Sequence, residues 1–467
     1  MMKLSILWLT LLAFLLAQVT AEGFEVPQVW ENLNFTRQVD VSRVYGREKI
    51  LLDVKNVGKE DATEYFMALP IDLLNKISVV TSIIKDRETF PDTLLTKNIT
   101  ILDDGSKIGY VKMVLPEPAA AKEEISIIVT LEYNARGVPY PESIGLNEEQ
   151  HLLLTTNKLP LSAYLTKEST LLFIGSSSFE EINGPSDESL KGEEGENSIS
   201  FGPFKNTKAY TNDNKVKLKY LHNVPLNVVT TLKRDLWISH WGSVVQFQEY
   251  YELTNRAAKL NKGFSRLEHM KQMQQTLNGH YRGILDNILP TGATDHYYTD
   301  LVGMVSTSQI KGAHFYLKPR YPIYGGWKYN YTIGWTNELS DFVHSIDNNS
   351  FILSAPLLNG PVDTAYDTVE LSLYLPEGAI VEEIDSPLPY EKVSIDTEKS
   401  YFDLNKGHVK VTFTFNNLID ELRGGKVLIK YQYDNVAFYK KPLSIATYIF
   451  VALLSIFTLN QINIRVN

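Results

Sequence analysis

Residue types that carry out chemistry in enzymes are present in this sequence, but not at the spacings that enzymes use. The nine histidines include no His-Glu-x-x-His pair, the helical spacing with which zinc peptidases bind their metal. Gly175-Ser-Ser-Ser178 lacks the second glycine of a serine hydrolase elbow, and no Gly-x-x-x-x-Gly-Lys phosphate loop occurs. The absence of cysteine excludes thiol nucleophiles, thiolate zinc sites and iron–sulfur clusters. The motifs therefore predict no catalytic residue, no metal site and no cofactor.

The composition leaves one enzymatic alternative open, because a pair of carboxylates is enough for a glycosidase. The chain has 55 acidic residues, yet nothing singles out two of them, and Glu193-Glu194 and Glu382-Glu383 are most simply solvated charges. A membrane-tethered, glycosidase-like hydrolase is therefore one alternative function, and a receptor ectodomain of tandem sandwiches is another. The net charge of −10 and the lack of a basic block argue against a nucleic-acid partner.

One stretch combines residue types that are typical of interaction surfaces. Between residues 314 and 335, aromatic side chains, two prolines and a Gly-Gly pair surround one arginine, Arg320. Tyr321, Tyr324 and Trp327 offer rigid amphipathic area on which a guanidinium can stack. These four residues are our candidate interface or peptide-holding surface. An aromatic corner inside the core is the alternative explanation of the same residues.

Four Asn-x-Ser/Thr triplets are candidate sites of N-glycosylation. They begin at Asn34, Asn98, Asn330 and Asn348. Such triplets arise often by chance and are modified only in chains that enter the secretory pathway. Whether they matter therefore depends on the address of the chain, which its two ends indicate.

The N-terminal end is typical of a secretory signal. An apolar run from Leu4 to Ala17 follows the positive charge of Lys3, and Val19-Thr20-Ala21 supplies small residues for cleavage. We therefore predict a signal peptide over residues 1–21. A cleaved signal of this kind delivers the chain that follows to the lumenal or extracellular side.

The C-terminal end predicts a membrane anchor. The run from Leu443 to Leu459 carries no charge and is rich in aliphatic side chains. A run of this length can cross a thin bilayer as a helix. We predict a transmembrane helix over 443–462, a cytosolic stub over 463–467, and single-pass type I topology. A buried core helix and a removed lipid-anchor signal are alternatives. The bulky residues just before the run argue against the lipid anchor.

The body between these ends is predicted to be mainly β. Runs such as Ile125–Tyr133 are rich in β-branched residues and are separated by turn residues, which favours sandwiches. A faint echo between Arg37–Asn56 and Arg234–Asn255 indicates two similar halves. We therefore predict two tandem β-sandwich-like domains, 22–225 and 226–441. Two local exceptions are a polar loop over 176–200 and a helix over 264–277.

Several blocks, in order along the chain, resemble the ribophorin I family, a type I membrane subunit of the oligosaccharyltransferase complex. The run Lys318–Trp327, read as Lys-Pro-Arg-Tyr-Pro-Ile-Tyr-Gly-Gly-Trp, is similar to the signature of that family. Tyr297–Ser308, with Met304 where an Asn is expected, Ile238–Gly242 and Leu375–Gly378 are similar to other blocks. The likeness covers nearly the whole body and the predicted span.

The resemblance implies a non-catalytic subunit of the complex that transfers a preassembled oligosaccharide from dolichol pyrophosphate to Asn in Asn-x-Ser/Thr of nascent chains. In that family a separate subunit carries out the chemistry, while ribophorin I stabilises the complex and holds client polypeptides. The implied partners are the other subunits, including the catalytic one, nascent polypeptides and the translocon. The implied location is the endoplasmic reticulum membrane, with the bulk in the lumen. Longer members carry a cytosolic domain after the span, so the short tail resembles the fungal-type form, without ribosome contact through that domain.

Overall fold

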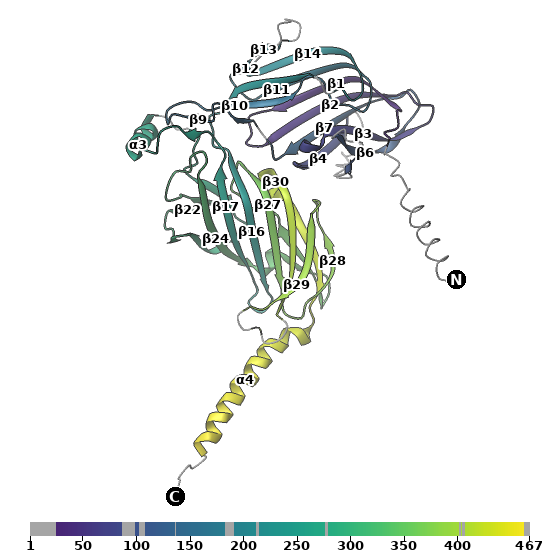
Figure 1. Cartoon of the computed structure of the whole chain (residues 1–467). Helices are drawn as coiled ribbons and strands as arrows, with labels where there is room; N and C mark the ends of the chain where they lie inside the picture. The colour runs from purple at the N-terminus through teal and green to yellow at the C-terminus, as the bar shows by residue number, and fades with distance from the viewer. Residues whose placement is uncertain are drawn as a thin grey trace, which may run out of the picture.

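A computed structural model of the chain describes residues 25–85, 99–101, 108–135, 137–182, 191–211, 214–275, 279–400, 403 and 407–461. It shows two strand-rich bodies and a long helix, α4 (Asn435–Gln461), which leaves the second body on the side away from the first (Figure 1). The prediction of a mainly β fold with a C-terminal apolar helix is confirmed. The predicted signal peptide, the cytosolic stub and Asn98 lie outside the described residues.

The first half, from β1 to β15, is built on a seven-stranded sheet. Its neighbouring strands are antiparallel except for β1 and β11, which run parallel. In spatial order the strands are β13 (Glu193–Gly195), β14 (Ser198–Thr207), β11 (Thr166–Ile174), β1 (Trp30–Asp40), β2 (Gly46–Asn56), β7 (Glu124–Tyr133) and β4 (Ile77–Ile84).

The second half, from β16 to β31, is built on an eight-stranded sheet with the same order and one strand added at its edge. Here β16 and β27 form the parallel pair. In spatial order the strands are β29 (Lys392–Glu398), β30 (His408–Ile419), β27 (Thr364–Leu375), β16 (Asn227–Ser239), β17 (Val244–Asn255), β24 (Lys328–Glu338), β20 (Thr294–Asp300) and the added β21 (Gly303–Met304).

A second layer of smaller sheets is also duplicated. In the first half it holds a four-stranded sheet, β12 (Phe179–Glu181), β15 (Lys215–Leu221), β10 (His151–Asn157) and β8 (Val138–Pro139), and a three-stranded sheet, β3 (Ala62–Pro70), β6 (Ile108–Ala119) and β5 (Ile99–Ile101). In the second half the corresponding orders are β28 (Ile380–Asp385), β31 (Lys426–Gln432), β26 (Ser350–Pro356) and β25 (Val343–Ser345), and then β19 (Leu285–Ile288), β23 (His314–Leu317) and β22 (Ser308–Lys311).

The faint echo in the sequence is therefore one repeat of the whole fold. Its two copies begin with the hairpins β1–β2 and β16–β17. The asparagine that ends each hairpin has the same role, because Asn56 Oδ1 accepts from Gly58 N (2.9 Å) and Asn255 Oδ1 accepts from Ala257 N (3.0 Å). The proposed boundary between residues 225 and 226 lies between β15 and β16, and independent folding of each half stays a prediction.

Alternation of side chains along the strands explains how polar groups come to lie inside. On β2 every second residue is buried, so Ile50, Leu52 and Val54 face the second layer. Glu48 belongs to the same row and is 2% exposed. A carboxylate in an apolar row requires a partner, because an unpaired buried charge is costly.

The apolar cores of the two halves differ in continuity. In the second half, one cluster of buried side chains runs through both layers, from Leu232 on β16 to Tyr431 on β31. In the first half the buried side chains form two main clusters. One cluster includes Phe35 and Met67, and the other includes Val39 and Leu152.

Polar contacts join the two halves. Asn134 Nδ2 of the first half donates to Asp367 Oδ1 of the second (2.8 Å), and Arg256 Nη2, also of the second half, holds the other oxygen of Asp367 (2.6 Å). Glu421 lies 3.5 Å from Arg47 of the first half. The short strands β9 (Ser143–Ile144) and β18 (Lys259–Leu260) add a parallel two-stranded sheet across the junction.

Of the two local exceptions predicted from the sequence, the helix is present and the polar loop is only partly so. The predicted helix is present as α3 (Arg266–Gln275), whereas the polar loop expected over 176–200 is wrong in part. Strands β12 and β13 and the start of β14 lie there, because backbone pairing with β15 and along β14 outweighs the polar composition. The remaining short helices are α2 (Ile71–Leu74), η2 (Leu339–Asp341) and η3 (Asp420–Gly424).

Candidate interaction sites

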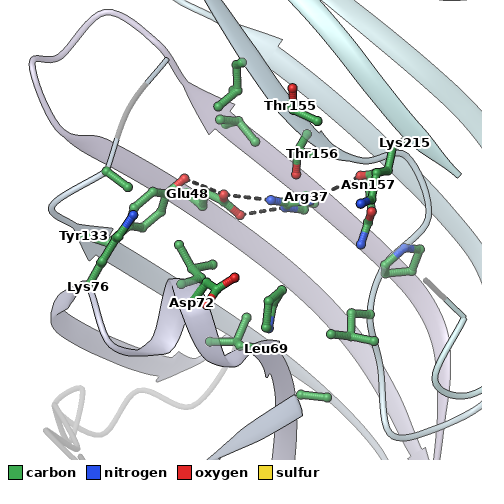
Figure 2. Close-up of a pocket in the computed structure, with 18 of the residues that line it drawn as sticks. Arg37, Glu48, Leu69, Asp72, Lys76, Tyr133, Thr155, Thr156, Asn157 and Lys215 are labelled. Atoms are coloured by element: carbon green, nitrogen blue, oxygen red, sulfur yellow. Dashed lines mark hydrogen bonds and ion pairs between the residues drawn. The ribbon is translucent and has the colours of Figure 1, made fainter. Parts of the chain in front are cut away.

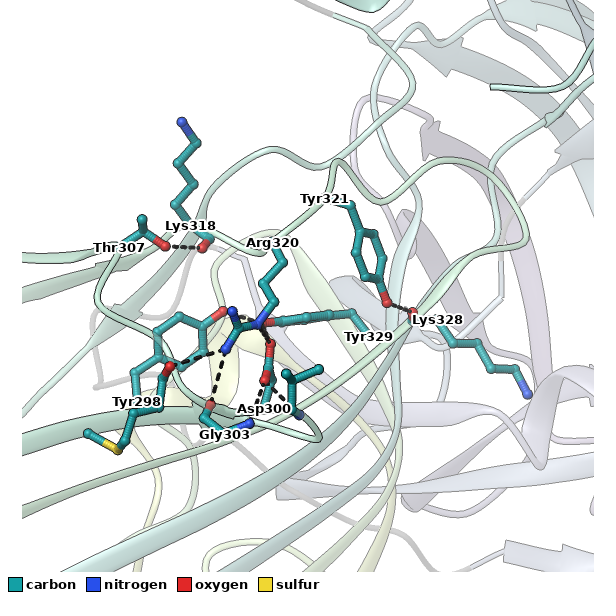
Figure 3. A network of polar contacts seen from close by, with 11 residues as sticks. Tyr298, Asp300, Gly303, Thr307, Lys318, Arg320, Tyr321, Lys328 and Tyr329 are labelled. Atoms are coloured by element: carbon teal, nitrogen blue, oxygen red, sulfur yellow. Dashed lines mark hydrogen bonds and ion pairs between the residues drawn. The ribbon is translucent and has the colours of Figure 1, made fainter. Parts of the chain in front are cut away.

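Arg320 fastens the loop after β23 to the turn between β20 and β21 (Figure 3). Its Nε lies 2.5 Å from Asp300 Oδ2, and its Nη2 donates to Met304 O (3.1 Å). Asp300 Oδ1 accepts from the backbone N–H groups of Val302 (2.9 Å) and Gly303 (3.1 Å). Burial alone would raise the pKa of Asp300, but the bond from Arg320 and these two N–H groups hold it below its usual value. The guanidinium therefore braces the turn.

The braced turn presents apolar side chains to solvent. Leu301, Val302 and Met304 are 81%, 80% and 69% exposed, although their backbone is held by Asp300 and Arg320. A rigid turn with exposed aliphatic side chains is typical of a contact surface, because little conformational entropy is lost on binding. The sequence interpretation named Arg320 but missed this turn, whose only signal was an Asp three residues before a Gly.

The other three residues of the predicted surface do not lie together on the outside. Tyr321 is 40% exposed, donates from its hydroxyl to Lys328 O (2.9 Å), and packs edge-on against Trp327. Tyr324 is fully buried, and its hydroxyl lies 2.7 Å from Nδ1 of His269 on α3. The structure therefore places Tyr324 in an aromatic corner of the core, with Trp327 between this corner and the surface.

The described acceptor asparagines occupy different environments. Asn348 is exposed at the tip of the hairpin between β25 and β26. Asn34 and Asn330 are half-buried within β1 and β24, and their amides lie 3.4 Å from Asp53 Oδ2 and 3.0 Å from the hydroxyl of Tyr250. A glycan needs an extended, accessible acceptor, so the structure favours Asn348 among the described triplets.

A cleft of about 650 Å³ lies in the first half, between its large sheet and the two small sheets of the second layer (Figure 2). Its volume is within the range of ligand sites, roughly 300–1,000 Å³. The floor comes from β1 and β2, and the walls come from β3 and α2 on one side and from β10 on the other. The apolar lining includes Phe35, Val39, Ile50, Leu69, Leu153 and Leu154.

One ion pair lies at the floor of the cleft. Arg37 Nε and Nη2 donate to the two carboxylate oxygens of Glu48 (2.6 and 2.8 Å), and the hydroxyl of Tyr133 donates to Glu48 Oε1 (2.6 Å). Burial would lower the pKa of Arg37 and raise that of Glu48, but their attraction reverses both shifts. Burial also raises the pKa of Tyr133. The three groups satisfy one another and leave no net charge at the floor.

Two carboxyl groups that alter each other's pKa lie at the junction between the two halves, not in the cleft. Burial and the neighbouring Glu421 raise the pKa of Glu132 to about 7. Arg47 lies beside both carboxyls, at 3.3 Å from Glu132 and 3.5 Å from Glu421. Within the part of the chain that the structure describes, no group of three or more His, Cys, Asp or Glu could hold a metal ion.

Helix α4 is long and apolar enough to cross a membrane, and its apolar side chains are exposed. The predicted span from residue 443 begins one residue after Pro442, which lies inside this helix. Just before it, Lys441 Nζ pairs with Asp403 Oδ1 of the second half (2.6 Å). Within α4, four hydroxyls donate to the backbone carbonyls four residues earlier: those of Ser444, Thr447, Ser455 and Thr458.

Comparison with known proteins places these features in a wider context. The family model described as Ribophorin I matches residues 30–460. Dolichyl-diphosphooligosaccharide–protein glycosyltransferase subunit 1A of Arabidopsis thaliana is 24% identical over 444 residues, which cover 92% of this chain and 70% of that protein.

Subunit 1 of the same enzyme from Schizosaccharomyces pombe is 24% identical over 432 residues, covering 90% of this chain and 92% of that protein. Among solved structures, a putative protease from Parabacteroides distasonis is 8% identical with a TM-score of 0.24, covering 87% of this chain and 99% of that one. A score this low carries no argument about fold or activity.

Proposed function

Because the chain belongs to the ribophorin I family, we propose that it is an accessory subunit of the oligosaccharyltransferase complex, acting in protein N-glycosylation. The single observation that carries this proposal is the extent of the family match, residues 30–460. It takes in both copies of the repeat and nearly all of α4. No observation favours the hydrolase or the receptor alternative.

The subunit acts by binding, while catalysis belongs to another subunit. The features described above are contact surfaces: a braced apolar turn at Leu301–Met304 and a cleft whose buried charges neutralise each other. The turn suits a partner subunit, because its rigid aliphatic side chains are exposed. The cleft suits a client polypeptide. The partners of the protein are accordingly the other subunits, including the catalytic one, and nascent chains, with the translocon close by.

The topology is single-pass type I, with both halves in the lumen of the endoplasmic reticulum. Three features support this orientation: the signal-like N-terminal sequence, the apolar helix α4, and the exposed acceptor Asn348 in the body. Protease added to sealed microsomes should leave both halves intact and digest them only after detergent is added. Digestion of both halves in sealed vesicles would refute this orientation and indicate that they face the cytosol.

Two measurements test the role. Affinity purification of the full chain in mild detergent should recover the other subunits of the complex, including the catalytic one. Depletion of the chain should leave Asn-x-Ser/Thr sites of many secreted proteins unmodified, and re-expression should restore them. Complete glycosylation after depletion, with no co-purifying subunits, would refute the proposal.

A further inference from the structure

Each copy of the repeat has a gap in its second layer, between the four-stranded and the three-stranded small sheet. In the second half this gap is filled by the chain itself. Residues 357–362 follow β26 and lie against the outer edge of β19. Ile288 N donates to Asn359 O (2.7 Å), and Val362 N donates to Asp286 O (2.9 Å). Leu357 and Leu358 are fully buried in the continuous core. A strip of polypeptide therefore closes the gap between the two small sheets.

The equivalent strip in the first half, residues 158–165 after β10, does not pair with β3. It contacts that strand through side chains: the Tyr164 hydroxyl accepts from Phe66 N (3.2 Å), and the Tyr164 ring packs against Tyr65. Among the residues that the structure describes, no backbone hydrogen bond joins the strip to β3. The cleft lies at this place and is lined by members of both core clusters, such as Met67 and Val39. The first core is thus divided where the second one is bridged.

The outer edge of β3 directs backbone groups into the cleft. Glu64 O accepts from Trp30 Nε1 (2.8 Å), and Phe66 N donates to the Tyr164 hydroxyl, both on the side away from β6. Along a strand, backbone groups of alternate residues point to the same side. Ala68, two residues on, therefore directs its N–H and C=O away from β6, and it lines the cleft.

Strand β10 directs backbone groups into the cleft from the opposite wall. Lys158 N donates to Asn214 O (2.6 Å) on the β15 side, while Asn157 O accepts from Arg37 Nη1 (3.3 Å) on the other side. Thr155 has the parity of Asn157 and so points its N–H and C=O into the cleft. Among the described residues, β8 pairs with this edge opposite Leu152 and Leu153, and Tyr140 N donates to His151 O (2.9 Å), so neither contact reaches Thr155.

We propose that the cleft binds an extended polypeptide segment, which pairs with the β3 edge, the β10 edge or both and so completes the second layer of the first half. The occupant is inferred from the second half, where a strip of chain takes the equivalent place and pairs with the edge strand. Adding a strand to exposed edges is an established mode of peptide recognition. This inference rests on the proposed function, since it names the site at which a client chain would be held.

The floor of the cleft selects for uncharged side chains, whereas its exposed rim carries Asp72, Lys76 and Lys215. Phe35, Val39 and Ile50 give the floor an apolar surface for every second residue of the segment. Arg37 and Glu48 are already paired with each other, so a charged side chain placed on the floor would find no buried counter-ion there. The segment is therefore an unfolded stretch with β-branched or other apolar residues at alternate positions.

The first test uses the unmodified full chain in mild detergent and a fluorescent peptide of alternating valine and serine. N-methylation of one alternate set of residues blocks pairing along one edge of the peptide and leaves its side chains unchanged. We expect binding by the parent peptide and a loss of at least about tenfold for one or both alternately methylated peptides, because several backbone hydrogen bonds are removed. Equal affinity of all three peptides, or no binding, would overturn the proposal.

The second test changes the cleft. Thr155→Pro removes the N–H that points into the cleft and leaves the side of β10 that pairs with β15. Thr155→Val is the matched control, because it keeps the N–H and alters only an exposed side chain. We expect peptide binding to be roughly threefold to tenfold weaker for the proline variant and unchanged for the valine control. Equal weakening in both variants would refute backbone pairing.

The occupant in cells is identified by a photo-crosslinking amino acid at Thr155 in microsomes. Adducts with nascent polypeptides support the proposal. Adducts confined to lipid, to another subunit or to this chain itself would overturn it. In parallel, the Thr155→Pro variant is purified to see whether the other subunits still accompany it. If the complex stays intact while peptide binding is lost, the change affects this site and not the role of the chain as a subunit.

Discussion

The ion pair at the floor of the cleft should be strongly coupled, and a double-mutant cycle measures this. The perturbations are Arg37→Met, Glu48→Gln and the two together. Arg37→Met leaves the Glu48 carboxylate buried, with a side chain 3% exposed, and removing one partner of a buried pair costs about 3–5 kcal/mol. Glu48→Gln should cost about 1–3 kcal/mol, because Arg37 is 17% exposed and the amide oxygen still accepts a hydrogen bond.

The double variant should cost less than the sum of the single variants. It contains no unpaired charge, and the hydroxyl of Tyr133 still has an amide acceptor at position 48. We expect a cost of about 1–3 kcal/mol for the double change, and hence a coupling energy of about 4 kcal/mol from the midpoints of these ranges. Hydrogen exchange of peptides from β1 and β2 reports the free energy of opening of this sheet, without contributions from the second half.

A pH series supplies an independent check on the same pair. The pKa of Glu48 in the folded chain lies below its unfolded value of 4.5. Its contribution to stability is therefore present above pH 4.5 and is lost as the pH falls through the folded pKa. This loss should be absent from variants that carry Glu48→Gln. Strict additivity of the two substitutions, to within about 0.5 kcal/mol, would refute the reasoning.

Three further outcomes follow from single sites. Asn348→Gln should remove one glycan as a mobility shift on electrophoresis, whereas Asn34→Gln and Asn330→Gln should not; a shift from either mid-strand site would contradict the burial argument. Asp300→Asn should raise hydrogen exchange in the turn at Val302 by about tenfold or more, because Arg320 loses its charged acceptor, while Thr307→Val on the neighbouring loop should not. Glu132 has a folded pKa of about 7, above its unfolded value of 4.5, so its contribution to stability is present at low pH and is lost as the pH rises through about 7. Glu132→Gln should therefore flatten the stability of the junction between about pH 5 and 8 in thermal unfolding, and an unchanged slope would count against this assignment.

The strands could be predicted from the sequence because their physics is local. Alternation along Ile125–Tyr133 and similar runs places every second side chain on one face, and β7 lies there. The echo between Arg37 and Arg234 predicted the repeat, because the two hairpins that carry these residues are built alike. The polar residues between 176 and 200 gave a prediction that was wrong in part, because β12 pairs with the distant β15, whereas β13 and β14 form a local hairpin.

The sites could be predicted only in part, because they depend on contacts between distant segments. The stretch around Arg320 has no regular period, so its sequence could not show that Tyr324 turns inward while Arg320 stays at the surface. The cleft brings together Leu69, Tyr133 and Leu154, which no motif connects. Its open edges become visible only when the two copies of the repeat are compared strand by strand.

The short connection between the second half and α4 has a mechanical consequence. Only Tyr433 and Asp434 separate β31 from α4, and the pair between Lys441 and Asp403 adds a second attachment one side chain away from the apolar run. The start of the helix is thus joined to the second half at two points, and we expect the two to tilt together. A small tilt of the helix, imposed by whichever helices pack against it in the bilayer, would swing the first half through a larger arc and re-aim its cleft.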